Sequence, residues 1–166
     1  MHEPPLERIK YVQMDLNLPY HYYAGDCRAL YLRALKDKKI LGSRCGKTGK
    51  VFVPPVINAP DSFEACDEIV ELPDRGLVTT FCVVNVPVYG RDLELPYVVA
   101  SVALDGADVS IFALVQECKA DDVHMGTRVE AVWLPDGERK GDHSDIKYFR
   151  PTGEPDAPLE SFIHRL

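Results

Sequence analysis

Two cysteines, Cys45 and Cys66, are the residues whose type and spacing first suggest chemistry, because cysteine thiolates are common ligands of structural zinc. Both lie in the stretch "ILGSRCGKTGKVFVPPVINAPDSFEAC", residues 40–66. A zinc ribbon needs two pairs of closely spaced cysteines, and this stretch contains neither pair. His21 and His124 lie far away along the chain. We therefore expect that this segment holds no zinc ion.

Catalytic groups are also sparse. Cys45 lies beside Arg44 and Lys47, cations that would favour its thiolate form. No histidine follows at a spacing that suggests a catalytic base, so packing or surface exposure is the favoured interpretation of this thiol. Four aspartates flank turns, where carboxylates serve local hydrogen bonding: Asp105, Asp108, Asp121 and Asp122. The sequence has no phosphate-binding loop, dinucleotide fingerprint or nucleophile elbow, so it predicts a binding role rather than chemistry of its own.

The composition is that of a folded protein with an acidic balance. The 166 residues are 46% hydrophobic and 27% charged, with a net charge of −7 and a pI of about 5.2. An acidic chain repels phosphate backbones, so non-specific nucleic-acid binding is disfavoured. The one basic cluster suits either a solvated helix end or a contact with a phosphate-bearing ligand. It comprises Lys36, Lys38, Lys39, Arg44, Lys47 and Lys50.

Cysteine usage points to a reducing compartment. Five cysteines are an odd number, and Cys27, Cys82 and Cys118 lie in apolar segments, where a thiol behaves as a small hydrophobic group. The N-terminal residues do not resemble a signal peptide, and no apolar run reaches the ~18 residues that a membrane span needs. We therefore expect a cytoplasmic protein without membrane association.

The first part of the chain predicts an arm, a helix and a hairpin. Residues 1–39 are expected to form an extended arm, rich in proline and tyrosine, followed by the helix. The tyrosines of the arm suit either anchoring on another surface or packing on their own domain. Residues 40–63 predict two strands around a glycine-containing turn, with Pro54 and Pro55 ending the second strand.

The remainder predicts a mainly β protein. Residues 64–152 alternate short apolar runs with turn signals, and Asp105-Gly106 is the strongest hairpin dipeptide among them. Five or six such strands without alternating helices favour an OB-type Greek-key barrel. Some of their apolar residues must face outward, where they would mark an interface. Residues 153–166 are expected to form a surface tail or a partner-binding peptide.

The order of these parts resembles a known family. The segments "LKDKKILGSRC", "VPP" and "PYVVASVALDGADVSIFALV" follow one another as in the rubredoxin-like zinc-ribbon plus OB-fold family of acyl-CoA-associated proteins. The resemblance covers residues 18–152. It implies a small accessory subunit of the kind that accompanies thiolase-type or hydratase-type enzymes.

The resemblance also locates the metal ligands of the family. Its four ligand positions fall on Cys45, Thr48, Ala59 and Ser62. One thiolate of four remains, so the resemblance implies a degenerate ribbon in which zinc is not expected. Its shape would then depend on packing by Val51, Phe52 and Val53, and Cys66 would lie beyond the ribbon, at the entry to the barrel.

The function implied by the resemblance is non-catalytic. A thiolase-like partner would supply the catalytic residues for CoA-dependent C–C cleavage of a bulky aromatic or steroid 3-oxoacyl-CoA, in a hetero-oligomer with this chain. No cofactor is expected to bind tightly, and the coenzyme A thioester would be the substrate of the complex. We expect Lys38, Lys39 and Lys47 to contact the CoA phosphates.

Three alternatives remain open. One is a subunit of an acyl-CoA hydratase complex, and another is an enzyme that uses Cys45. The third is an OB-type nucleic-acid binder, which would need a basic groove with aromatic stacking platforms. The predicted strands carry few aromatic residues, and the net charge opposes that binding.

Overall fold

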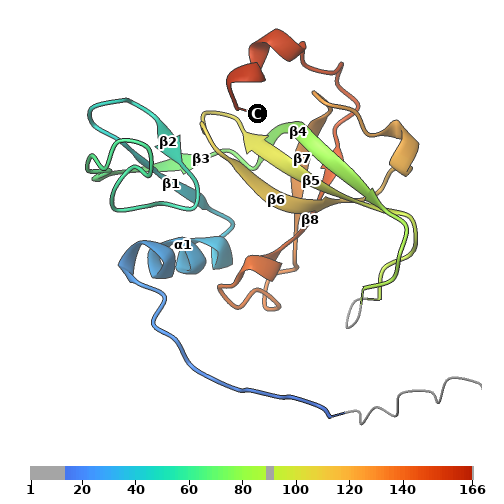
Figure 1. Cartoon of the computed structure of the whole chain (residues 1–166), viewed down its shortest axis with the longest axis horizontal. Coiled ribbons are helices and arrows are strands. Elements are labelled where there is room, and N and C mark those ends of the chain that lie inside the picture. The colour runs from blue at the N-terminus through green and yellow to red at the C-terminus, as the bar shows by residue number, and fades with distance from the viewer. Residues whose placement is uncertain (1–13, 89–91, 166) are drawn as a thin grey trace, which may run out of the picture.

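The computed structural model describes residues 14–88 and 92–165, which form an exposed arm, one α-helix, a small sheet and a barrel (Figure 1). The helix is α1 (Asp26–Lys36), followed by β1 (Ile40–Arg44), β2 (Val51–Phe52) and β3 (Glu68–Leu72). The later strands are β4 (Arg75–Val84), β5 (Tyr97–Leu104), β6 (Ser110–Val115), β7 (Arg128–Trp133) and β8 (Ile146–Pro151). Short 3-10 turns are η1 (Ala120–Asp122), η2 (His143–Asp145), η3 (Leu159–Ser161) and η4 (Ile163–Arg165).

Helix α1 is amphipathic and packs its apolar side against β1. Tyr31 and Leu35 are four residues apart, so they share one face, and both are buried. Asp26 lies in the first turn, whereas Arg33 and Lys36 lie in the last, an arrangement that suits the helix dipole at both ends. The predicted helix is confirmed, and it positions Tyr31 toward the barrel.

The small sheet, strands β2-β1-β3 in that order, differs from the expected hairpin by one strand. β1 pairs antiparallel with β2 on one side and with β3 on the other, with Gly42 opposite Val70. The run at Glu68–Leu72 was predicted as part of the barrel segment 64–152, and in the structure its hydrogen-bonded neighbour is β1. Strand type is set locally, but the pairing partner of an edge strand is chosen by tertiary contacts.

The barrel is closed and consists of five strands in the order β4-β5-β6-β8-β7. β5 and β6 pair antiparallel around the turn that begins at Asp105, where Gly106 adopts a φ of 84° that glycine tolerates best. The ring closes through a parallel pairing of β6 with β8 and an antiparallel pairing of β7 with β4. The expected mainly β, OB-like architecture is confirmed.

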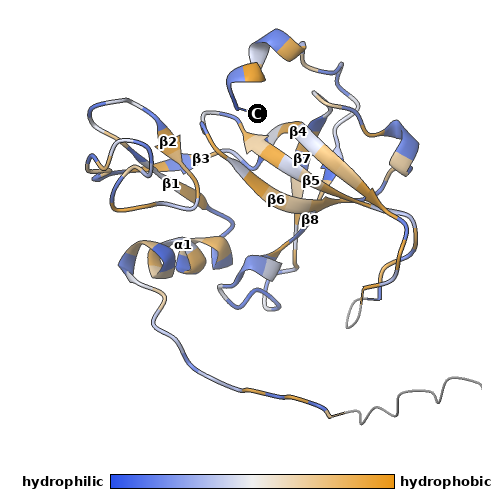
Figure 2. Cartoon of the chain, in the orientation of Figure 1, coloured by the Kyte–Doolittle hydropathy of each residue, from blue (hydrophilic) through white to orange (hydrophobic). Residues whose placement is uncertain are grey.

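One hydrophobic core joins the helix, the small sheet and the barrel. Val78, Val102 and Phe149 are fully buried inside the barrel, and the same core includes Val51 and Val53 next to them. Figure 2 shows apolar residues concentrated along the barrel strands. The predicted packing role of the Val51–Val53 segment is confirmed, so the small sheet and the barrel are packed as one unit.

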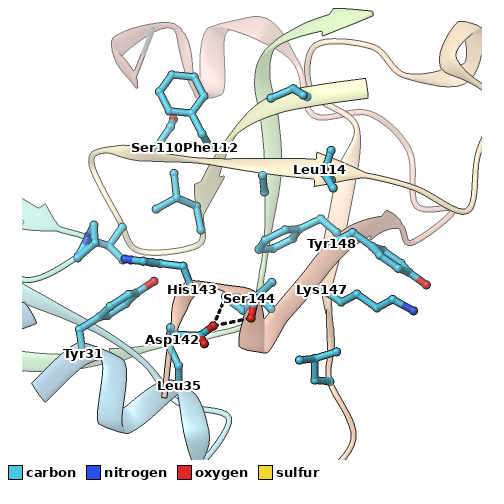
Figure 3. A pocket seen from close by; sticks show the side chains of 18 of the residues that line it. Tyr31, Leu35, Ser110, Phe112, Leu114, Asp142, His143, Ser144, Lys147 and Tyr148 are labelled. Atoms are coloured by element: carbon cyan, nitrogen blue, oxygen red, sulfur yellow. Dashed lines mark hydrogen bonds between the residues drawn. The ribbon is translucent and has the colours of Figure 1, made fainter. Parts of the chain in front are cut away.

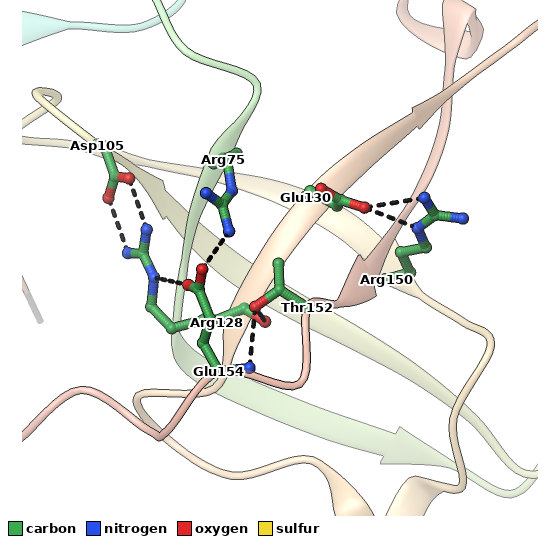
Figure 4. Close-up of polar contacts among 7 residues, drawn as sticks. All are labelled: Arg75, Asp105, Arg128, Glu130, Arg150, Thr152 and Glu154. Atoms are coloured by element: carbon green, nitrogen blue, oxygen red, sulfur yellow. Dashed lines mark hydrogen bonds and ion pairs between the residues drawn. The ribbon is translucent and has the colours of Figure 1, made fainter.

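A cluster of ion pairs closes one end of the barrel (Figure 4). The Arg128 guanidinium donates two hydrogen bonds to the Asp105 carboxylate, at 2.8 and 2.6 Å, and lies 3.7 Å from Glu154. Arg75 donates to Glu154 at 2.7 Å. Hydrogen bonding by Arg128 lowers the pKa of Asp105. The predicted turn aspartate is therefore also a tertiary anchor.

The C-terminal segment packs on the barrel rather than lying free. Phe162 is completely buried and packs with Leu77 and Ala103. The backbone of Ala157 also donates to the Gly126 carbonyl at 2.9 Å. Residues 153–166 were predicted to form a surface tail or a partner-binding peptide. Most of residues 153–165 are exposed, and Phe162 anchors the segment at an apolar site on the barrel.

Candidate ligand-binding groove

A groove of about 1100 Å³ lies where α1, the small sheet and the barrel meet. Its walls come from segments that are far apart in the sequence. They include Arg28, Tyr31 and Leu35 of α1, Val53 and Pro54 after β2, Tyr97 and Val99 of β5, residues 110–114 of β6, and residues 142–144 and 146–149 around η2 and β8. This volume is slightly above the range of roughly 300–1,000 Å³ that is typical of small-molecule and cofactor sites.

The β5–β6 wall of the groove is apolar. Phe112 of β6 is 85% exposed, and Ile111, Leu114 and Val99 are half-buried beside it. The predicted outward-facing apolar residues are therefore confirmed on this wall. An exposed phenyl ring over half-buried aliphatic groups is suited to an apolar ligand or to a partner surface.

A cluster of polar side chains lies where α1 approaches η2 (Figure 3). Arg28 Nη2 lies 3.3 Å from His143 Nε2, so the guanidinium donates and the imidazole accepts. Tyr31 packs against the same imidazole, with ring centroids 5.9 Å apart. Desolvation and the nearby Arg28 charge lower the pKa of His143, and burial raises the pKa of Tyr31 to about 12. At neutral pH this end of the groove therefore offers a cation, a neutral imidazole and a protonated phenol.

Asp142, His143 and Ser144 contain the residue types of a catalytic triad but not its geometry. The Asp142 carboxylate accepts two hydrogen bonds from Ser144, one from its backbone N–H at 2.7 Å and one from its side-chain hydroxyl at 2.5 Å. Asp142 is therefore the N-cap of η2. His143 faces Arg28 instead of either neighbour. A relay needs the base between nucleophile and carboxylate, and that order is missing. Among the residues lining the groove, no histidine is placed between a nucleophile and a carboxylate.

The three lysines predicted to contact CoA phosphates are not among the residues that line the groove. Each forms an ion pair with a different carboxylate: Lys38 with Asp136 at 3.7 Å, Lys39 with Glu71 at 3.0 Å and Lys47 with Glu64 at 2.5 Å. A phosphate would have to displace these partners, all of which are solvent-exposed or half-buried. The lysine contacts stay a prediction.

The two cysteines of the opening stretch are neighbours in space. Cys45 and Cys66 are buried in one small cluster with Phe52 and Ala59. The Thr48 hydroxyl and N–H hydrogen-bond to the Cys45 sulfur and lower its pKa. Burial, with Cys45 beside it, raises the pKa of Cys66. Cys66 was predicted to lie beyond the ribbon, at the entry to the barrel. That prediction was wrong, because the pairing of β3 with β1 brings Cys66 into the cluster of Cys45.

The ligand positions implied by the resemblance do not suit zinc. Of the four, Cys45 is buried, Thr48 is exposed, Ala59 is a buried methyl group and Ser62 is half-buried. Cys66 raises the number of nearby thiols to two, whereas structural zinc takes four ligands. Within residues 14–88 and 92–165, no group of three or more His, Cys, Asp or Glu side chains is placed to hold a metal ion.

The groove was not predicted from the sequence. Arg28 and His143 are 115 residues apart, and no local pattern connects them. Tyr31 carries no signal in the sequence beyond the apolar spacing that it shares with Leu35. The one local signal is the capping box of Asp142 and Asp145, which predicts a turn and says nothing about its neighbours. In the described part of the chain no helix is long and apolar enough to cross a membrane.

Fold and groove together define an OB-fold protein with a largely apolar groove beside its barrel. A family model described as the ChsH2 C-terminal OB-fold domain matches residues 69–134. A DUF35 domain-containing scaffold protein from Methanocaldococcus jannaschii is 32% identical over 125 residues, 72% of this chain and 86% of the relative. Another from Methanothermobacter thermautotrophicus is 31% identical over 117 residues, 68% of this chain and 86% of that relative. The chain belongs to the DUF35 family.

Two solved structures share the fold. One is named an Ltp2-ChsH2(DUF35) aldolase; it is 25% identical, with a TM-score of 0.55 over 75% of this chain and 93% of that chain. The other is a DUF35 protein of unknown function from Sulfolobus solfataricus, 19% identical, with a TM-score of 0.56 over 76% of this chain and 84% of that chain. Both matches extend beyond the barrel residues alone.

Proposed function

We propose that this protein is a non-catalytic accessory subunit of a thiolase-type enzyme that acts on an acyl-CoA. The observation that carries the proposal is a large, mostly apolar groove that lacks an arranged set of catalytic groups. Such a surface can bind or cover a substrate but needs another chain for chemistry. The relatives from both methanogens are named scaffold proteins, which agrees with a role in assembly.

The groove is suited to cover part of an acyl-CoA. Its β5–β6 wall would contact an acyl chain or the pantetheine arm, while Arg28 and Lys147 bring positive charge to the lining. Lys38, Lys39 and Lys47, which lie outside the groove lining, remain our proposed contacts for the CoA phosphates. A bulky aromatic or steroid acyl group is proposed on the family resemblance, not on any residue of this chain.

The exposed arm supports association with a partner. In residues 14–22 every second side chain is apolar, and these five are 66–82% exposed: Met14, Leu16, Leu18, Tyr20 and Tyr22. The rings of Tyr20 and Tyr22 lie 6.5 Å apart, as expected for side chains on the same face of an extended chain. Residues 14–24 form no backbone hydrogen bond with the described body of the protein. An extended segment with one apolar face is suited to bind along a partner surface.

The reaction of the complex has two candidates. The family resemblance favours thiolysis, in which free CoA attacks a 3-oxoacyl-CoA and releases two acyl-CoA products. The aldolase name of the structural neighbour favours cleavage of a 3-hydroxyacyl-CoA without free CoA. Both reactions break a C–C bond next to the thioester end, so the same accessory groove would serve either one.

The proposal is tested by co-expressing the full chain with thiolase-type proteins from the same organism and purifying any complex by a tag on this chain. We expect stoichiometric co-elution, and C–C cleavage by the complex but not by this chain alone. A requirement for free CoA identifies thiolysis, whereas release of a ketone or aldehyde without it identifies aldol cleavage.

Arm variants sharpen that test. Replacing both Leu16 and Leu18 by Ser removes apolar contacts and is expected to weaken co-elution, whereas the matched Asn17→Ser variant changes the opposite side of the arm and is not. The proposal is wrong if the chain elutes as a monomer in every co-expression, or if it binds single-stranded DNA at physiological salt. Hydration of an enoyl-CoA by the complex would instead identify a hydratase partner.

A further inference from the structure

The backbone of the small sheet holds Cys45 and Cys66 side by side. β1 and β3 pair with Arg44 opposite Glu68, and beyond the end of β1 the Gly46 N–H donates to the Ala65 carbonyl at 3.4 Å. The two cysteines lie between these two contacts, one on each limb. Their relative position is therefore set by paired backbone and not by mobile side chains.

The two thiols also share one buried cluster. Cys45 and Cys66 pack there with Phe52 and Ala59. The other described cysteines, Cys27, Cys82 and Cys118, belong to α1, to β4 and to the segment after β6. Within the described residues, this is the one pair of thiols that shares a cluster.

We propose that Cys45 and Cys66 are a covalent modification site that closes to a disulfide when the protein meets a peroxide. The Cys45 thiolate attacks the peroxide O–O bond, giving Cys45 sulfenic acid and hydroxide when the oxidant is hydrogen peroxide. The Cys66 thiol then attacks the sulfenic sulfur, forming the S–S bond and releasing water. Two electrons pass from the thiol pair to one peroxide, so no other reactant is needed.

Burial of the pair is shallow enough for this reaction. Cys45 is followed by residues 46–50, all of which are exposed, and Cys66 lies between exposed Ala65 and exposed Asp67. Cys45 and Cys66 are themselves 0% and 5% exposed, so the proposal requires the exposed turn at residues 46–50 to open and admit peroxide. The cross-link would close the loop between residues 45 and 66, the role that a four-ligand metal has in a zinc ribbon.

Mass spectrometry of the full chain gives a direct test. The purified, reduced protein is treated with hydrogen peroxide, alkylated without reductant and digested with trypsin. Trypsin cuts after Arg44, Lys47, Lys50 and Arg75, so Cys45 and Cys66 fall on the separate peptides 45–47 and 51–75. We expect these two peptides to be joined, two hydrogen atoms lighter than the reduced pair, and to separate again with dithiothreitol.

Matched variants and a melting curve complete the test. Cys82→Ser, which removes an exposed thiol elsewhere, should leave the cross-link intact, and Cys66→Ser should abolish it and leave Cys45 open to alkylation. Peroxide should raise the Tm of the wild-type chain by roughly 5 °C, and this rise should be absent in Cys66→Ser.

Three results would each overturn the proposal. They are full alkylation of both peptides after peroxide, joining of either peptide to one that carries Cys27, Cys82 or Cys118, and one equivalent of zinc per purified chain that is released on thiol oxidation. The wild-type measurement needs no substitution, so a variant that fails to fold does not remove the test. The test also needs no partner, so its outcome is independent of the proposed accessory function.

Discussion

Asp108 and Val51 exchange two hydrogen bonds across the junction between the small sheet and the barrel. The Asp108 N–H donates to the Val51 carbonyl at 2.9 Å, and the Val51 N–H donates to Asp108 Oδ2 at 2.8 Å. Val51 belongs to β2, and Asp108 to the turn between β5 and β6. The β5–β6 turn is therefore hydrogen-bonded to β2 at the edge of the small sheet, and this contact helps to hold the groove walls at a defined spacing.

Loss of the Asp108 carboxylate should loosen this junction. Asp108→Ala leaves the buried Val51 N–H without its acceptor, which costs about 1–3 kcal/mol of unfolding free energy. Asp108→Asn keeps an acceptor oxygen and should recover most of that loss. Urea unfolding followed by circular dichroism measures both, with exposed Asp121→Ala as the control. Equal stability of Asp108→Ala and Asp121→Ala would show that the hydrogen bond from the Val51 N–H to the Asp108 carboxylate contributes nothing.

Removal of the Phe162 ring should uncover the barrel. Phe162 is fully buried against Leu77 and Ala103, so Phe162→Ala should lower the unfolding free energy by roughly 3–5 kcal/mol. Its neighbour Ile163 is 57% exposed, and Ile163→Ala should change stability by less than about 0.5 kcal/mol. Thermal melts of the two variants give the comparison. A Phe162→Ala melt that matches Ile163→Ala would mean that the C-terminal segment is not anchored in solution.

The imidazole of His143 should make stability sensitive to mild acid. Its pKa in the folded chain is lowered, so the unfolded chain binds the proton more tightly. The contribution of His143 is then fully present above its ordinary pKa of about 6.5 and is lost as the pH falls below that value. Between pH 7 and pH 5.5, wild type should lose more stability than His143→Gln, measured by urea midpoints. The other histidines are present in both proteins, so a parallel loss would contradict the assignment to His143.

The exposed ring of Phe112 should matter for binding and not for folding. Phe112 is 85% exposed in the groove, so Phe112→Ser should leave the Tm of the isolated chain nearly unchanged. The affinity of the Phe112→Ser variant for the partner or for an acyl-CoA should fall roughly 10-fold, which is the size of loss expected when an aromatic side chain is removed from an interface. Phe63→Ser is the matched control, because Phe63 is 82% exposed but outside the groove lining. If both variants bind as wild type does, the groove is not the binding surface.

Local chemistry accounts for the elements that sequence reasoning predicted. The hairpin at Asp105 follows from a dipeptide whose glycine adopts a positive φ, and α1 follows from the four-residue spacing of Tyr31 and Leu35. The pairing of β3 is not set by local chemistry. The run of five residues at Glu68–Leu72 indicates that a strand forms there, but which strand it pairs with depends on tertiary contacts.

By itself, the sequence of this chain determined a mainly β, OB-like protein without a recognisable catalytic motif, because strand periodicity, turn residues and motifs are read within a few positions. Only the tertiary structure decided what lies together. It brought Arg28 to His143 across 115 residues, and it joined Cys45 to Cys66 by adding β3 to the small sheet. The physical reason is that contacts between distant segments depend on burial of a shared core, and no residue carries that information in its own neighbourhood.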